Sequence, residues 1–294
     1  MFSKILIATD FSSEAFAVLK GINGLRAYGT RECLLLLGLT LQEENSTKLL
    51  HTNPQLEKYL QELRETLGKQ GLKVKTRIVD RLTKNEIIQI SEEEKSSLIV
   101  VGAQTSSLLN ESLTGGIAYE ITHHCRKPIF IIRLAEIMVL GISNIEPMRC
   151  RYNEHILFPT DFSETADQAF RIVKQLVRAG AQKVTLMHVQ EQTRIESRLL
   201  SRLDEFNKTD EDRLASMKEV LQKEAAVEVD MIITYGNASK EIIRVVKNRP
   251  VQLVVMGSQG RGYVKELFIG SVSHNVARHA EASVLLIPAA SFRE

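Results

Sequence analysis

Residues 156–163 read ILFPTDFS and residues 5–12 read ILIATDFS, so six of these eight positions are identical across a separation of 151 residues. A second matched pair, LIVVGAQ at 98–104 and LVVMGSQ at 253–259, follows further along in the same order. Matches that keep their order over such distances indicate a duplicated unit of about 130–140 residues and not a short solenoid repeat. The sequence of 294 residues therefore predicts two domains joined by a connector, with the bounds 1–133, 134–152 (connector) and 153–294.

Within each copy, short runs of Val, Ile and Leu alternate with stretches of helical periodicity. The predicted strands are 4–8, 33–39, 73–79, 97–101 and 128–132 in the first copy, and 155–159, 183–188, 228–234, 252–256 and 283–287 in the second. Continuous apolar runs are typical of parallel strands covered on both faces, and their alternation with helices predicts right-handed βαβ crossovers. The predicted fold class is α/β, with two doubly wound, five-stranded parallel-sheet domains. Ligands bind such sheets at the carboxyl ends of the strands, so the loops after the first and fourth strands are the candidate sites.

Composition and charge exclude several classes of protein. The formal net charge is +2, divided evenly between the halves, so neither half has the excess of basic residues typical of nucleic-acid binding. The longest apolar stretch, 34–41, is far shorter than the roughly 20 residues of a membrane span, and Asp10 interrupts the apolar run that a signal peptide would need. Three scattered cysteines without a CxxC pair fit reduced thiols. We expect a cytoplasmic protein that binds neither nucleic acid nor membranes.

Glycines gather after the predicted fourth strand of the second copy. Four of the sixteen glycines lie within 257–270, and Gly270-Ser271 is predicted to open a helix. Glycine lets the backbone approach a ligand closely, and the free N–H groups of a helix start favour anions. Arg261 adds a positive charge, while Ser271 and Ser273 add hydroxyl donors. The segment therefore predicts a phosphate site, although it matches neither the Walker loop nor GxGxxG, because Lys265 stands where the third glycine would be.

This glycine pattern carries a family resemblance. Gly257-x₂-Gly260-x₉-Gly270-Ser271 matches the G-2x-G-9x-G-S/T motif of the universal stress protein family, in its ATP-binding branch. The whole chain resembles a tandem universal stress protein. The resemblance implies an adenine nucleotide alpha hydrolase-like sheet of order 3-2-1-4-5, with adenine and ribose near the loop after strand 1 and phosphates in the glycine loop. It implies ATP or AMP as the ligand, with Mg²⁺ as a companion of ATP.

The resemblance also implies a set of nucleotide-binding residues in the second copy: Pro159, Thr160, Asp161, His188, Val189, Gly236, Ala238, Met256, Gly257, Gly260, Arg261, Gly262, Gly270, Ser271, Val272 and Ser273. From the residues alone, two roles stay open for Asp161. Its short carboxylate suits either a nucleoside contact or the cap of the following helix, where Ser163 is also a candidate. His188, taken alone, is equally an ordinary histidine at the end of a strand.

The first copy departs from this pattern. Its weaker candidates are Thr9, Asp10, Gly102 and Gly115. Thr105 stands in the place of Gly260, Ser106 replaces Arg261 and Gly116 replaces Ser271, while Arg81-Leu82 replaces the Gly236-Asn237 turn. Because close-approach glycines, the arginine and hydroxyl donors are lost, we expect this copy to bind nucleotide weakly or not at all.

Binding residues are easier to find in the sequence than catalytic ones. It contains no nucleophile–base pair, no HExxH and no acidic cluster for two metals, so no catalytic residue and no metal ligand is assigned. We expect an adenine-nucleotide-binding stress-response regulator. A slow ATPase and a nucleotide-independent interaction module are the alternatives, and a response-regulator receiver is a weaker alternative for the fold. The apolar last strands of the two copies are expected to pair within the chain as a pseudo-dimer, and a homodimer is also expected.

Overall fold

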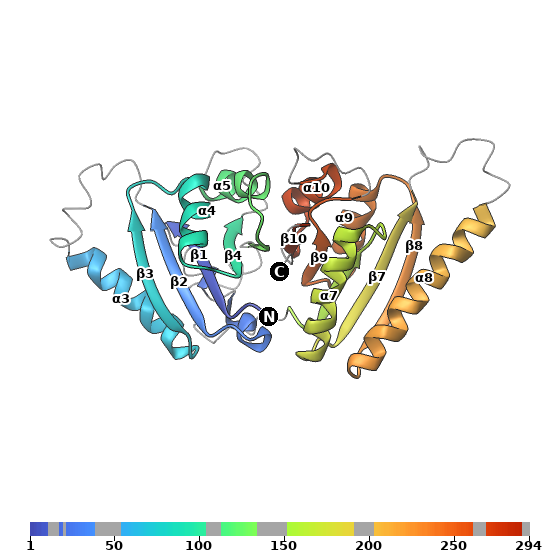
Figure 1. The fold of residues 1–294 in the computed structure, drawn as a ribbon, viewed down its shortest axis with the longest axis horizontal. Helices are drawn as coiled ribbons and strands as arrows, with labels where there is room; N and C mark the ends of the chain where they lie inside the picture. Colours follow the sequence, from blue (N-terminus) through green and yellow to red (C-terminus); the bar gives the residue numbers. More distant parts are fainter. Residues whose placement is uncertain are drawn as a thin grey trace. The chain divides into compact units, whose positions relative to one another are not determined.

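The computed structural model describes residues 1–10, 18–19, 22–38, 54–103, 113–133, 152–190, 203–260 and 269–289 (Figure 1). Contacts between Cα atoms divide the chain into two compact units, Met1–Cys150 and Arg151–Glu294. The predicted connector at 134–152 lies outside the described residues, apart from Tyr152.

The first unit is a parallel sheet of five strands in the order β3-β2-β1-β4-β5. Its strands are β1 (Lys4–Asp10), β2 (Glu32–Gly38), β3 (Lys73–Val79), β4 (Leu98–Ala103) and β5 (Ile129–Arg133). Its described helical elements are the 3₁₀ helix η1 (Ile22–Tyr28), α3 (Pro54–Lys69), α4 (Lys84–Glu93) and α5 (Leu113–Thr122).

The second unit repeats this architecture, in the order β8-β7-β6-β9-β10. Its strands are β6 (His155–Pro159), β7 (Lys183–Gln190), β8 (Glu228–Tyr235), β9 (Leu253–Gly257) and β10 (Ser283–Ile287). Its described helices are α7 (Glu164–Arg178), α8 (Leu203–Glu224), α9 (Ala238–Asn248) and α10 (Ser271–His279). Each unit thus has the strand order 3-2-1-4-5, and the predicted fold class is confirmed.

The central strands form the core because helices cover both of their faces. Every residue of β6 and β9 is buried, which explains why these strands are continuous apolar runs in the sequence. In Figure 1, α8 runs alongside β7 and β8, and it contacts both strands. In the part of the chain that the structure describes, no helix combines the length and apolar character needed to cross a membrane.

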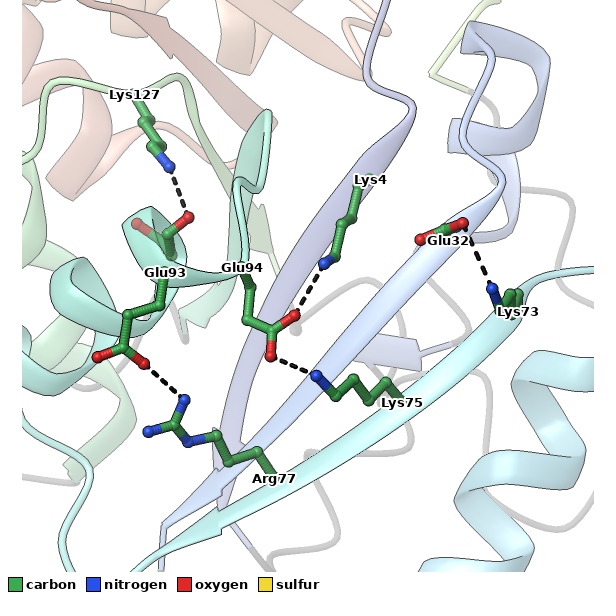
Figure 2. A network of polar contacts seen from close by, with 9 residues as sticks. Lys4, Glu32, Lys73, Lys75, Arg77, Glu93, Glu94 and Lys127 are labelled. Atoms are coloured by element: carbon green, nitrogen blue, oxygen red, sulfur yellow. Dashed lines mark hydrogen bonds and ion pairs between the residues drawn. The ribbon is translucent and has the colours of Figure 1, made fainter.

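A network of ion pairs joins α4 to the sheet of the first unit (Figure 2). Glu94, at the end of α4, accepts hydrogen bonds from Lys4 of β1 at 2.8 Å and from Lys75 of β3 at 2.5 Å. These two hydrogen bonds lower the pKa of the Glu94 carboxyl from 4.5 to about 2. Arg77 of β3 donates to the neighbouring Glu93 at 2.8 Å. The network ties the carboxyl end of α4 to two strands.

Candidate functional site

In the second unit, the loops after β6 and β9 meet at the carboxyl edge of the sheet. The amide of Thr160 donates to the Met187 carbonyl at 2.8 Å, which continues the β6–β7 pairing into the loop. Asp161 follows, and its carboxylate lies against Gly260 of the glycine loop. A Cβ built on Gly260 would stand 2.6 Å from Asp161 Oδ2, which is closer than side-chain carbons come to other atoms. Any residue other than glycine at position 260 would therefore displace the Asp161 carboxylate.

Of the two roles considered for Asp161, the helix cap belongs to Ser163. Ser163 is the N-cap residue of α7, and its hydroxyl accepts the amide of Ala166 at 3.3 Å. Asp161 instead accepts the Ser163 amide through Oδ1, at 3.1 Å. This bond orients the carboxylate, with Oδ2 directed to the glycine loop.

Two glycines at the end of β9 and the start of α10 have different reasons to be glycine. A Cβ on Gly257 would lie 2.9 Å from Thr165 Cγ2 and 3.1 Å from the Thr165 carbonyl carbon, so α7 packs directly on this backbone. A Cβ on Gly270 would make only ordinary contacts, the shortest at 3.6 Å to the Ser258 carbonyl oxygen. Gly270 is the N-cap residue of α10 and supplies no side-chain cap. The first turn of α10 consequently offers its N–H groups to another acceptor.

The first turn of α10 contains the three remaining candidates of this loop. Ser271 is exposed and Val272 is half-buried. Ser273 is buried, and its hydroxyl donates to the Gly257 carbonyl at 2.8 Å. We predicted Ser271 and Ser273 as a pair of donors to a ligand. In the structure, the Ser273 proton joins α10 to the end of β9. The predicted Arg261 and Gly262 lie outside the described residues.

The end of β7 and the turn after β8 form the other side of the candidate site. His188 is buried, and its Nδ1 donates to the carbonyl oxygen of Thr160 at 2.7 Å, whereas Val189 beside it is half-buried. Gly236 has φ +136°, a backbone conformation that favours glycine, and its amide donates to the Gln190 carbonyl at 3.0 Å. The remaining candidates lie in neighbouring elements: Pro159 ends β6, Ala238 begins α9 and Met256 lies in β9.

Three residues beside the site were missed by the sequence analysis. Phe162 has a left-handed backbone with φ 58°, and its ring lies 4.7 Å, centroid to centroid, from the ring of His188. Arg213 of α8 lies over the Phe162 ring, with Cζ 5.2 Å from its centroid. Asp210, one turn earlier in α8, places Oδ2 3.4 Å from His188 Nε2. Phe162 belongs to the repeated TDFS segment, which was a usable signal, whereas no short-range pattern marks the two α8 residues.

In the first unit, a leucine packs on the corresponding edge of the sheet. Gly38 ends β2, where the strand register makes it the counterpart of Val189. A Cβ on Gly38 would overlap Leu82 Cβ and would lie 2.9 Å from the Leu82 nitrogen, so Leu82 packs directly on the end of β2. The weaker candidates are placed on β1 (Thr9, buried, and Asp10), on β4 (Gly102) and on α5 (Gly115).

The described residues of neither unit suggest a metal centre. In the ranges that the structure describes, no three His, Cys, Asp or Glu side chains gather closely enough to hold a metal ion. The cysteines with described side chains, Cys33 and Cys125, are buried and unbridged. Burial raises the pKa of the Cys125 thiol to about 11, which makes it a poor ligand or nucleophile near neutral pH.

Comparison with known proteins gives one consistent result. The model of the universal stress protein family matches residues 1–133 and 153–288. Universal stress protein MJ0577 from Methanocaldococcus jannaschii is 33% identical over 150 residues, which cover 45% of this chain and 93% of that protein. Universal stress protein YxiE from Bacillus subtilis is 25% identical over 143 residues, covering 45% and 97%.

A solved structure extends the likeness of fold to both halves. The crystal structure of a universal stress protein from Archaeoglobus fulgidus has a TM-score of 0.70 and 23% sequence identity, with 98% of each chain covered. The family model matches both units, in agreement with the internal repeat. The chain therefore belongs to the universal stress protein family, with one family domain in each half.

Proposed function

We propose that this protein is an adenine-nucleotide-binding stress-response regulator, which binds ATP or AMP mainly through its C-terminal unit. The observation that carries the proposal is the approach of the Asp161 carboxylate to the backbone of Gly260 at the carboxyl edge of the sheet. A carboxylate there accepts hydroxyl or amino hydrogens of a nucleoside, and a glycine beside it lets phosphates approach backbone N–H groups. Parallel α/β sheets bind ligands at this edge.

Different residues bind different parts of the nucleotide. Asp161 holds the nucleoside, and the backbone of His188 and Val189 lies beside the adenine. The glycine loop and the uncapped start of α10 at Ser271 hold the phosphates, with the charge of Arg261 in support. Mg²⁺ accompanies the phosphates when the nucleotide is ATP. The preference of one unit over the other rests on Leu82, because a leucine packed on the end of β2 occupies the side on which the second unit would receive the base.

Paired substitutions and a titration test this proposal. Isothermal titration calorimetry with ATP, ADP, AMP and GTP on the full chain should give one strong adenine-nucleotide site per chain, with GTP weaker. Asp161→Ala should remove that site, and the matched change in the first unit, Asp10→Ala, should leave it. No heat with any adenine nucleotide would refute the proposal. Two equal sites per chain, or loss of binding in the Asp10 variant alone, would refute the preference for the C-terminal unit.

The proposal also covers assembly and location. We propose that β5 and β10, the last strands of their units, pair within the chain as a pseudo-dimer, and that two chains associate as a homodimer. Both strands are composed almost entirely of Ile, Leu, Val and Phe, and an apolar strand at the edge of a sheet needs a cover. A protease site inserted within 134–152 should leave the two halves co-eluting after cleavage, and sedimentation should give twice the chain mass. The buried, unbridged Cys33 and Cys125 are consistent with a cytoplasmic protein.

A further inference from the structure

The outer strand of the second unit exposes large hydrophobic side chains. β8 is the last strand of its sheet, and in the described part of the chain no strand pairs with its outer side (Figure 1). Met231 of β8 is 43% exposed and Tyr235 is 41% exposed. A third exposed hydrophobic residue, Val220, lies on α8, which contacts β8. An edge strand of this kind is a template for pairing with another strand.

The backbone of β8 directs alternate hydrogen-bonding groups to its outer side. The amide of Glu228 donates to the Gln182 carbonyl at 2.9 Å, and the amide of Gly236 donates to the Gln190 carbonyl at 3.0 Å. In a parallel ladder, the N–H and C=O groups of one residue point to the same side, and the side alternates along the strand. The even-numbered residues of β8 therefore face β7, and the N–H and C=O groups of the odd-numbered residues, such as Ile233, point outward.

The first copy carries positive charge along the corresponding edge. The strand registers make β3 the counterpart of β8, with position 73 matched to position 228. Charged side chains, lysine above all, are a common means of keeping an edge strand from pairing. Thr76 and, directly after β3, Asp80 stand where the second copy has Met231 and Tyr235. The exposed residues within β3 are all basic: Lys73, Lys75 and Arg77.

The sequence of β8 is self-complementary in the antiparallel direction. If two copies meet with Ile233 opposite Ile233, odd-numbered residues face odd-numbered residues, so the outward backbone groups of the two strands meet. Met231 of each chain then lies opposite Tyr235 of the other on one face, and methionine packs favourably against aromatic rings. Asp230 lies opposite Gly236, so no like charges face each other.

A head-to-tail contact, with β3 of one chain on β8 of another, is the alternative that charge would favour. Those charges are already paired within each unit, however. Asp230 of β8 accepts from Lys183 at 2.9 Å. Lys75 and Arg77 of β3 pair with Glu94 at 2.5 Å and with Glu93 at 2.8 Å. A head-to-tail contact also leaves a free edge at each end, whereas a two-fold contact between identical edges closes on itself.

We propose that β8 is the surface through which two chains associate, with the two β8 strands antiparallel around a two-fold axis at Ile233. The inference rests on the homodimer of the proposed function and names the surface that forms it. The strand of eight residues is about 26 Å long. Together with the flank of α8, it would bury on the order of 1,000 Å² in total, at the lower limit for a specific interface. We therefore expect a dissociation constant in the micromolar range.

Sedimentation of the full chain from about 1 to about 300 µM tests the proposal. The double variant Met231→Thr/Tyr235→Asp gives this edge the residues of the first copy. It should weaken the dimer about tenfold or more, because the two-fold axis places each substitution in the interface twice. Lys73→Glu is the matched control on the other edge, where the side chain is 82% exposed, and it should leave the dimer unchanged. Thermal unfolding checks that both variants are folded.

Chemical cross-linking tests the position of the axis. Opposite residues of an antiparallel pair have Cβ atoms about 5 Å apart, so two cysteines at position 233 lie within reach of a short bismaleimide. Ile233→Cys should therefore give linked pairs of chains, in a background of Cys150→Ser in which Cys33 and Cys125 are buried. Ile78→Cys, at the matching position of β3, should remain unlinked.

The outcomes separate the interface from the rest of the proposed function. An unchanged dissociation constant in the folded double variant would overturn the role of β8 and leave the homodimer standing. Weakening by Lys73→Glu to the same extent would overturn it in favour of the head-to-tail contact. Absence of linked chains in Ile233→Cys, at a concentration where the wild type is dimeric, would also overturn it. A wild type that stays monomeric throughout would remove the homodimer together with its interface, while calorimetry would still report nucleotide binding.

Discussion

Gly260→Ala is the most direct perturbation of the candidate site, because it adds one carbon at the point where two loops touch. The new Cβ would stand 2.6 Å from Asp161 Oδ2 and 3.6 Å from Asp161 Cγ. The first distance is roughly 1 Å short of a comfortable non-bonded contact. The carboxylate is a short side chain, so it relieves the overlap by rotating, and rotation moves Oδ1 away from the Ser163 amide that it accepts at 3.1 Å.

The magnitude follows from what the rotation removes. If Asp161 holds the nucleoside, its misplacement costs a hydrogen bond to a charged group, worth about 1.5–3 kcal/mol. At 1.4 kcal/mol for each factor of ten, the dissociation constant for ATP should rise about 10- to 100-fold. The fold itself should lose less, about 1 kcal/mol, because Gly260 is half-buried and its neighbour is the end of a side chain.

The assay is calorimetric titration with ATP, accompanied by thermal unfolding without ligand. Gly68→Ala is the matched control: a Cβ there meets nothing within 4 Å, and an alanine in a helix is favourable. This control should bind ATP as the wild type does and unfold at the same or a higher temperature. ATP affinity within about twofold of wild type in Gly260→Ala would refute the role of Asp161, given that the overlap is geometrically unavoidable.

Three further predictions concern stability. Glu94→Gln should lower the free energy of unfolding by about 1 kcal/mol, measured by urea unfolding at neutral pH. Because the pKa of Glu94 is lower in the folded state, the extra stability of the wild type is present above pH 4.5 and is lost as pH falls towards about 2. An unchanged advantage at about pH 3 would contradict this. Ser163→Ala should cost about 1 kcal/mol through loss of the α7 cap, and Ser163→Asp should restore most of it; equal unfolding midpoints for all three proteins would count against the cap. Ser273→Ala should lower the unfolding free energy by about 1 kcal/mol because the buried Gly257 carbonyl loses its donor. Ser271 is exposed, so Ser271→Ala should change the unfolding free energy by less than about 0.5 kcal/mol. Similar effects in both variants would refute the structural role of the Ser273 hydroxyl.

Much of the fold was predictable because most of its strands have a clear periodic pattern. A strand buried on both faces is a continuous apolar run, and the predicted strands 155–159 and 283–287 have the observed bounds. Strand 73–79, whose residues are exposed or half-buried, alternates polar and apolar residues instead, and it also has the observed bounds. The start of α10 at Ser271 was also predictable, since Gly270-Ser271 marks a helix boundary. Strand ends were less exact where polar residues extend the ladder, as at β7, which continues to Gln190.

The candidate site was predictable in part, for a different physical reason. The glycine motif and the TDFS repeat are local patterns, and the family resemblance that they carry points to Gly257, Asp161 and Gly270. The contact of His188 with Asp210 joins residues on different elements, and only the packing of α8 on β7 brings them together. Its chemistry is therefore invisible to any short-range pattern. The same holds for the cap of α7, where Asp161 and Ser163 are equally good candidates by type and only the geometry separates them.

The two copies differ in structure even at a position where their sequences match. Glu86 and Glu241 are aligned by the repeat, yet Glu86 closes a capping box with Thr83, while Glu241 accepts from Thr234 at 3.3 Å and packs beside Gly236. The difference arises because α9 begins one residue earlier, relative to the repeat, than α4 does. Gly236, with its φ of +136°, permits the turn that follows β8 in the second copy, whereas the first copy has arginine at this point and follows another route. That route carries the next residue, Leu82, onto the end of β2. A change in turn residues thus gives the two copies of one fold different surroundings at the end of the second strand, which is the basis of the proposed preference for the C-terminal unit.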